Sequence, residues 1–103
     1  MKIKQGDVLM AHVVIRHKVK DYPKWKAAFD GFINTRRSGG EKSYQIFHPD
    51  DDPNNLLLVF EWDNLKNGRK FMNSKELKST MEKAGVLEAP EAYFLEEYEH
   101  GNV

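Results

Sequence analysis

The most informative pattern in this chain is a strand with apolar side chains on both faces. Residues 56–62 read Leu-Leu-Leu-Val-Phe-Glu-Trp, and successive side chains of a strand point to opposite sides of the sheet. One face therefore carries Leu56, Leu58, Phe60 and Trp62, and the other carries Leu57 and Val59. Such a strand belongs in a sheet that is covered on both sides.

Three other segments have strand patterns. Residues 8–19 are rich in β-branched and aliphatic side chains, residues 42–48 alternate in polarity, and residues 92–98 begin with aromatic and aliphatic side chains. The cluster of Pro, Asp and Asn at residues 49–55 predicts a turn. We therefore expect residues 42–62 to form a hairpin.

Two helical regions lie between these strands. In the first, apolar side chains recur at helical spacing from the N-cap residue Asp21 to a glycine pair at positions 39–40, which predicts one helix. In the second, Asp63 or Asn64 is the expected N-cap, and Ser74 marks a break followed by a restart.

The resulting element order, β-α-β-β-α-β, predicts an α+β, ferredoxin-like fold with a four-stranded antiparallel sheet. In this topology the strands are usually ordered 4-1-3-2, and both helical regions cover one face. The 103 residues predict a single domain, residues 1–103, with a core at about residues 8–99. Because the helices cover only one face, we expect a second copy of the sheet to cover the other face in a twofold homodimer.

The composition of the chain mainly excludes certain classes of protein and kinds of site. Sixteen Lys and Arg balance sixteen Asp and Glu, whereas a nucleic-acid-binding domain normally carries a net basic patch. Cysteine is absent, so disulfides, thiolate metal sites and a cysteine nucleophile are excluded. No apolar run approaches the ~20 residues that span a bilayer. We expect a cytoplasmic protein that binds neither nucleic acid nor membrane.

The first strand offers the candidate chemistry. His12 and Arg16 share one face of this strand, and His17 lies on the other. If the face with Val13 and Ile15 packs on the helices, His17 lies in a pocket. It is then a candidate catalytic base, because the ordinary pKa of histidine is near neutral. His12 and Arg16 then lie at the dimer face. The alternative is that all three are solvated or paired with glutamates at strand ends.

Aromatic and sulfur-containing side chains supply candidate ligand contacts. If a cavity lies between helices and sheet, its walls are expected to include Trp25, Phe29, Phe71 and Met81. The alternative is that these four are ordinary core residues, because core residues have the same helical spacing. Trp62 offers an indole N–H that can reach a partner, and Tyr44 offers a hydroxyl. We predict no metal site, because no histidine pair has zinc-motif spacing and the acidic turn lacks the Gly and distal Glu of a calcium loop.

Several short motifs match a known family. They are Trp25 and Phe29, the Asp-Asp-Pro-Asn turn at 51–54, Glu61-Trp62-Asp63, Phe71, Ser74-Lys75-Glu76-Leu77 and Ala84-Gly85-Val86. Over about residues 10–98 the chain resembles the antibiotic biosynthesis monooxygenase (ABM) family of the dimeric α+β barrel superfamily. The resemblance implies a homodimer that closes a dimeric α+β barrel, with a pocket between sheet and helices in each subunit.

The family includes cofactor-independent oxygenases of aromatic polyketides, quinol oxygenases and haem-degrading enzymes. The haem-degrading pattern uses an Asn on the first strand, a Trp in the second helical region and a His ten residues after that Trp. Here Phe71 and Met81 occupy the Trp and His positions, and residues 8–19 contain no Asn. The haem-degrading branch is therefore excluded, and we predict no cofactor.

The expected function is binding of a compact aromatic or quinol-like compound, with cofactor-independent monooxygenation as the predicted reaction. Oxygenation of this kind needs a substrate that can itself give up an electron, such as a phenolate, and a base that generates it. Two alternatives stay open: a non-catalytic binding or stress-related module, and an enzyme similar to a polyketide cyclase or isomerase. Oxygen dependence separates the monooxygenase from the cyclase.

Overall fold

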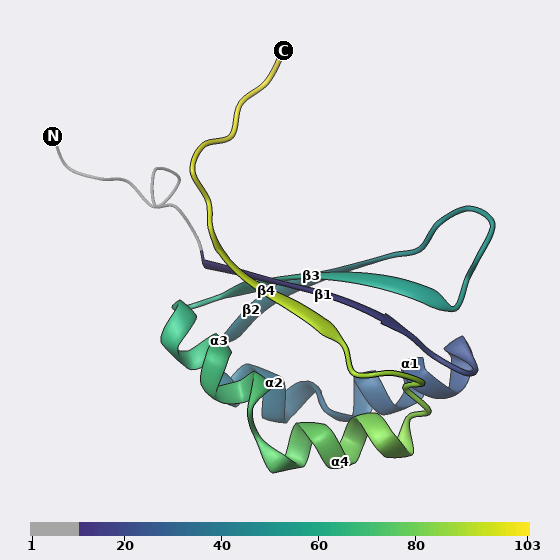
Figure 1. Cartoon of the computed structure of the whole chain (residues 1–103). Coiled ribbons are helices and arrows are strands. Elements are labelled where there is room, and N and C mark those ends of the chain that lie inside the picture. The colour runs from purple at the N-terminus through teal and green to yellow at the C-terminus, as the bar shows by residue number, and fades with distance from the viewer. Residues whose placement is uncertain (1–10) are drawn as a thin grey trace, which may run out of the picture.

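The computed structural model describes residues 11–103 and shows an α+β fold with one four-stranded sheet (Figure 1). In chain order the elements are β1 (Ala11–Lys18), α1 (Tyr22–Gly31), α2 (Ile33–Gly39), β2 (Glu41–Phe47), β3 (Asn55–Trp62), α3 (Leu65–Met72), α4 (Lys75–Lys83) and β4 (Glu91–Glu96). The predicted α+β, ferredoxin-like class is confirmed. Residues 8–10, which the prediction included in the first strand, lie outside the described residues.

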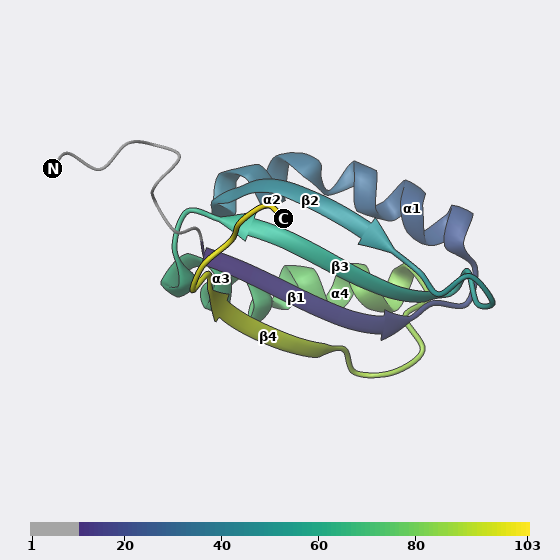
Figure 2. The same cartoon turned by 90° about the horizontal axis from the view of Figure 1, so that it is seen from above.

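The sheet has the order β2-β3-β1-β4, with every neighbouring pair antiparallel. This is the predicted order read from the other edge. The four helices that the structure describes lie on one face of the sheet, and no helix or strand of residues 11–103 covers the other face (Figures 1 and 2). None of the helices described in residues 11–103 is long and apolar enough to cross a membrane.

The helix-facing side of the sheet carries the core. Val13 of β1 lies opposite Phe60 of β3 and Phe94 of β4, and Ile15 lies opposite Leu58. Val13 and Ile15 are buried, as are the four apolar side chains that the period of two places on this side of β3: Leu56, Leu58, Phe60 and Trp62. The assignment of the two faces of the apolar strand is therefore confirmed.

The first helical region differs from the predicted single helix. It is divided into α1 and α2 at Phe32, whose φ of −95° and ψ of 8° leave the helical range. The residue before it, Gly31, has about 1 kcal/mol less helix propensity than alanine. The break also lets the Phe32 ring contact Phe71, with 5.8 Å between ring centroids. The apolar spacing did not reveal this break, because the spacing continues from α1 into α2 without interruption.

The predicted caps agree with the structure. The Asp21 side chain accepts a hydrogen bond from the Lys24 N–H at the start of α1. Asn64, rather than Asp63, is the N-cap of α3. Ser74 separates α3 from α4 and caps the latter, so the break predicted there is confirmed.

Candidate functional site

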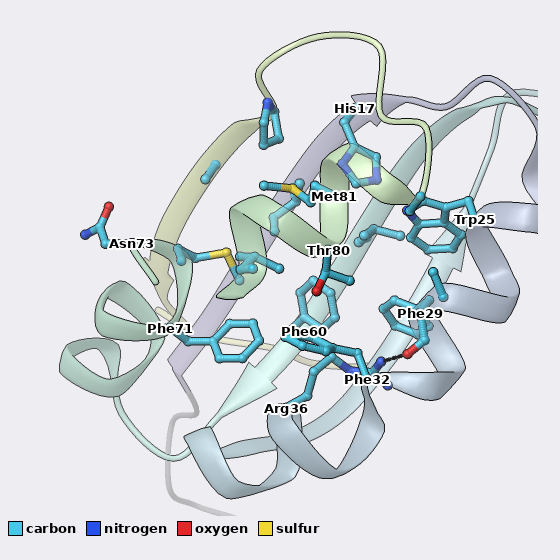
Figure 3. Close-up of a pocket in the computed structure, with 18 of the residues that line it drawn as sticks. His17, Trp25, Phe29, Phe32, Arg36, Phe60, Phe71, Asn73, Thr80 and Met81 are labelled. Atoms are coloured by element: carbon cyan, nitrogen blue, oxygen red, sulfur yellow. Dashed lines mark hydrogen bonds between the residues drawn. The ribbon is translucent and has the colours of Figure 1, made fainter. Parts of the chain in front are cut away.

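A cavity of about 260 Å³ lies between the helices and the helix-facing side of the sheet (Figure 3). Its wall is mostly apolar, with contributions from all the helices and from β1, β3 and β4. The volume is slightly below the 300–1,000 Å³ of most ligand pockets. The cavity therefore suits a compact, largely apolar molecule. Its polar lining residues are His17, Arg36, Asn73 and Thr80.

His17 brings a titratable ring to the cavity wall. It follows Val13 and Ile15 on the helix-facing side of β1, and only 7% of its surface is exposed. The ring packs edge-on against Trp25, with 5.7 Å between centroids. Both ring nitrogens are buried, and neither has a hydrogen-bond partner within residues 11–103. A neutral imidazole in this position still has one donor and one acceptor to offer a ligand.

Burial lowers the pKa of His17 from its ordinary value of 6.5 to about 4. The cause is desolvation, which disfavours the charged imidazolium. His17 is therefore neutral at physiological pH and able to accept a proton. An anion formed beside it in the apolar cavity would favour the imidazolium and raise the pKa again.

Arg36 is a second charged side chain at the cavity, and it is almost completely buried, with 3% exposed. Its guanidinium lies 3.6 Å from the centroid of the Phe29 ring. Nε lies 3.0 Å and 3.1 Å from the two carboxylate oxygens of Glu41, and Nη1 donates to the Phe29 carbonyl (dashed in Figure 3). Nη2 is buried and has no partner among the described residues.

The partner of this arginine is also affected by burial. Desolvation raises the pKa of the Glu41 carboxyl, and the Arg36 charge and hydrogen bonds oppose that rise. The Arg36–Glu41 pair thus brings little net charge to the cavity. Figure 3 shows His17 and Arg36 at opposite ends of the lining, on β1 and α2.

Comparison with solved structures identifies the fold. SnoaB, a cofactor-independent oxygenase from Streptomyces nogalater, matches with a TM-score of 0.72 and 11% identity over 90% of this chain and 97% of that chain. An antibiotic biosynthesis monooxygenase matches with a TM-score of 0.65 and 12% identity, over 87% and 100%. A conserved protein from Methanosarcina mazei Go1 matches with a TM-score of 0.66 and 16% identity, over 85% and 92%.

The chain has the ABM fold. Neither a protein-family model nor a curated protein matches it. Identities this low show a shared fold alone, because one fold supports many activities. The resemblance stated from the sequence motifs is confirmed at this level. Function has to be argued from the site.

Within the ABM fold, four of the predicted ligand-contacting residues surround the cavity together with His17. They are Trp25, Phe29, Phe71 and Met81. Trp25 and Phe29 stack with 4.8 Å between centroids and form one continuous aromatic wall. The repeat of helical spacing in both halves of the chain thus gathers these side chains at one place.

Trp62 and Tyr44 are not among the lining residues. Trp62 is completely buried in the core, where its ring contacts Phe71 at 5.1 Å. Its indole N–H was expected to reach a partner, but Nε1 has none within residues 11–103, so that expectation is corrected. Tyr44 lies on the edge strand β2, is 39% exposed, and contacts the lining residues Phe29, through a ring edge, and Arg36, whose guanidinium lies 5.3 Å from the Tyr44 ring centroid.

His12 and Arg16 lie on the uncovered side of the sheet, away from the cavity. In register, His12 is opposite Glu61 and Leu95, and Arg16 is opposite Leu57. No group of three or more histidine or acidic side chains that could hold a metal ion occurs in the part of the chain that the structure describes.

Arg36 is the site residue that sequence reasoning missed. A basic residue near the C-terminal end of a helix is favoured by the helix dipole in any case, so the position of Arg36 did not mark it as a site residue. The signal that could have revealed it is spacing: Trp25, Phe29, Phe32 and Arg36 recur every three or four residues, so Arg36 continues the apolar side of the helix. A charged residue in such a stripe is buried, and a buried charge needs partners.

Proposed function

We propose that this protein binds a compact phenol or hydroquinone in the cavity and oxygenates it without a cofactor, with His17 as the base. One observation carries the proposal: a neutral, unpartnered imidazole lies in the wall of an apolar cavity large enough for an aromatic ring. The ABM fold, shared with a cofactor-independent oxygenase, supports it by analogy.

The proposed reaction begins with proton transfer. His17 takes the phenolic proton, which leaves a phenolate beside an imidazolium in an apolar environment where their attraction is strong. The phenolate gives an electron to O₂, and recombination forms a C–O bond at a ring carbon. Loss of the ring proton and cleavage of the O–O bond leave a quinone and one water. The substrate supplies all the electrons, so no external reductant is needed.

The aromatic walls have a defined part in this proposal. Trp25 and Phe29 line the cavity as a stacked pair, and Phe71 and Met81 are also lining residues (Figure 3). Such walls hold the ring of the substrate and exclude water. Water exclusion protects the phenolate and the oxygen-derived intermediates from side reactions.

We also propose that the protein works as a homodimer through the uncovered side of its sheet. That side carries a row of partly or largely exposed apolar residues on all four strands: Val14, Phe47, Leu57, Val59, Tyr93 and Leu95. A contiguous exposed apolar patch is typical of an interaction surface. A second copy of the chain offers the same apolar patch, and a twofold axis makes the patch complementary to itself.

Oxygen consumption tests the catalytic proposal. We expect purified protein to consume O₂ with a phenol or hydroquinone and to form one quinone for each O₂ consumed. His17→Ala is expected to reduce turnover by at least about 100-fold, the lower limit for loss of a positioned base. Binding, measured by calorimetry, is expected to persist, although weakened by the loss of the hydrogen bond to His17. The matched control is His48→Ala, because His48 is exposed on the hairpin, does not line the cavity and hydrogen-bonds to the neighbouring Pro49 carbonyl.

Each other outcome selects an alternative. Binding without turnover in the wild type points to the carrier or stress-related module. Turnover that continues without oxygen points to a cyclase or isomerase. If no phenol binds, the small-molecule proposal itself is overturned.

A further inference from the structure

The unused donor of Arg36 has a consequence for ligand selection. A guanidinium has five N–H groups, and Nε and Nη1 already have partners in Glu41 and the Phe29 carbonyl. Nη2 adds two N–H groups that are buried without an acceptor in residues 11–103. Buried donors in native proteins are nearly always satisfied, and Arg36 is a lining residue of the cavity, so a ligand acceptor is the candidate partner of this donor.

A purely structural role does not account for this donor. The contact that joins α2 to β2 through Arg36 is made by Nε, with Glu41, which is the first residue of β2. Trp62 Nε1 is also buried without a partner, but Trp62 does not line the cavity, whereas Arg36 does. Among the described lining residues Arg36 is the one permanent cation.

The charge of the pair restricts the ligand group. Glu41 neutralises the guanidinium at short range, so a free carboxylate would gain little from Nη2 and would lose its hydration. A carbonyl oxygen accepts hydrogen bonds and is much less costly to bury. The donor therefore suits a neutral carbonyl that gains negative charge during the reaction.

The spacing of the site restricts the ligand size. Successive ring contacts join the two ends: Arg36 to Phe29 at 3.6 Å, Phe29 to Trp25 at 4.8 Å, and Trp25 to His17 at 5.7 Å. The guanidinium carbon and the imidazole centre are therefore no more than about 14 Å apart. From this limit we subtract two hydrogen bonds of about 2.9 Å each, and about 1 Å in each group between its centre and the bonding nitrogen. The two ligand oxygens can then be at most about 6 Å apart.

We propose that Arg36 is a specificity-determining residue whose Nη2 binds the carbonyl oxygen of a para-hydroxyphenyl ketone or aldehyde. Its phenolic and carbonyl oxygens lie about 6 Å apart across a single ring, which is within the upper limit that the ring contacts set for the distance between His17 and Arg36. When the phenolic O–H bond breaks and the proton moves to His17, conjugation places part of the negative charge on the carbonyl oxygen. Arg36 then stabilises the anion that His17 generates. This inference rests on the proposed function and adds the substrate class.

A matched pair of ligands tests the inference. Para-hydroxyacetophenone and para-ethylphenol have nearly the same shape, but only the first has a carbonyl. Calorimetry on the wild-type protein is expected to give a Kd at least about tenfold lower for the ketone. Arg36→Lys keeps a cation for Glu41 but lacks Nη2, and is expected to abolish the preference while changing the ethylphenol Kd less than about threefold. Arg37→Lys, on the neighbouring exposed residue, is the control.

The double variant Arg36→Met/Glu41→Gln removes both buried charges together. It provides the same comparison if Arg36→Lys does not fold. If neither variant folds, NMR of the arginine side chains in the wild type decides, because a Nη2 resonance shift is expected with the ketone and not with ethylphenol. Equal wild-type affinities, or a preference that persists in either folded variant, would overturn the role of Arg36. If neither phenol binds, it is the proposed function that fails.

Discussion

At the scale of single residues, the site is built from polar groups that the fold buries and leaves unsatisfied. His17 has no partner for either ring nitrogen, and Arg36 has none for Nη2, within residues 11–103. Each costs stability in the ligand-free protein, because a buried polar group without a partner loses its hydration. A bound para-hydroxyphenyl ketone would offer an oxygen atom to each of the two residues at once. The same groups that weaken the free protein are therefore the ones that favour the ligand.

His17 makes the stability of the protein depend on pH. Its pKa is about 4 in the folded protein, whereas the hydrated ring of the unfolded chain keeps the ordinary value of 6.5. Between these values the unfolded state binds more protons, so the free energy of unfolding falls as the pH is lowered. The loss from this one residue is about 3 kcal/mol over the window.

Urea denaturation across this pH window tests that prediction. His17→Leu, which replaces the ring by an apolar side chain, is expected to flatten the profile by about the same amount. His48→Leu, on the exposed hairpin, is the control and is expected to keep the wild-type slope. A His17→Leu profile that falls as steeply as the wild type would show that His17 is not kept neutral by burial.

At the scale of elements, alternation and helical spacing predicted most of what the structure shows. The period of two predicted which side chains of β1 and β3 share a face. It therefore placed His17 on one face of the sheet and His12 and Arg16 on the other. Spacing placed Trp25 and Phe29 together. What it did not show depends on tertiary packing: the break at Phe32, the withdrawal of Trp62 into the core, and the burial of Arg36 on the Glu41 carboxylate.

The junction between α2 and β2 offers a prediction about the element that holds Arg36 and Glu41. Gly40 ends α2 with φ of 118°, and a Cβ added there would lie 2.8 Å from Cγ of Asp63. Gly40→Ala is therefore expected to destabilise the protein by about 2 kcal/mol or more, from the left-handed backbone and the contact together. Gly31→Ala meets no atom within 4 Å, lies in α1, and is expected to be neutral or stabilising.

Chemical denaturation of these two variants measures the difference directly. The Asp63 carboxylate accepts hydrogen bonds from the Asn64 backbone N–H and the Asn67 side-chain amide, so it cannot retreat from an added Cβ without disturbing the start of α3. Equal stabilities for Gly40→Ala and Gly31→Ala would contradict the prediction that a side chain at position 40 is strained.

At the scale of the whole molecule, one face of the sheet makes the cavity and the other is available for assembly. The helices and the helix-facing side enclose the site, and the opposite side, which no helix of residues 11–103 covers (Figure 2), carries the row of exposed apolar residues. Both surfaces come from the same strands, because alternate side chains point to opposite sides. The two-faced strand β3 thus supports both proposals.

A matched pair of exposed apolar residues tests the dimer. Leu57 on the uncovered side of β3 and Ile33 on α2 are each 39% exposed. We expect the 12.0 kDa chain to sediment as a dimer, Leu57→Lys to sediment as a monomer, and Ile33→Lys to remain dimeric. A wild-type monomer at the highest concentration used, or dissociation by both variants alike, would remove the sheet face as the interface.

The most direct test of the central claim, that the cavity binds a compact phenol, compares two adjacent alanines of α1. Ala28 lines the cavity, whereas Ala27 is exposed. Para-hydroxyacetophenone at about 100 times its Kd is expected to stabilise the wild type by about 2.7 kcal/mol, which raises Tm by about 10 °C. We expect the same rise in Ala27→Phe and none in Ala28→Phe, where the added ring fills the cavity. An undiminished rise in Ala28→Phe, or no rise in the wild type, would contradict binding at this site.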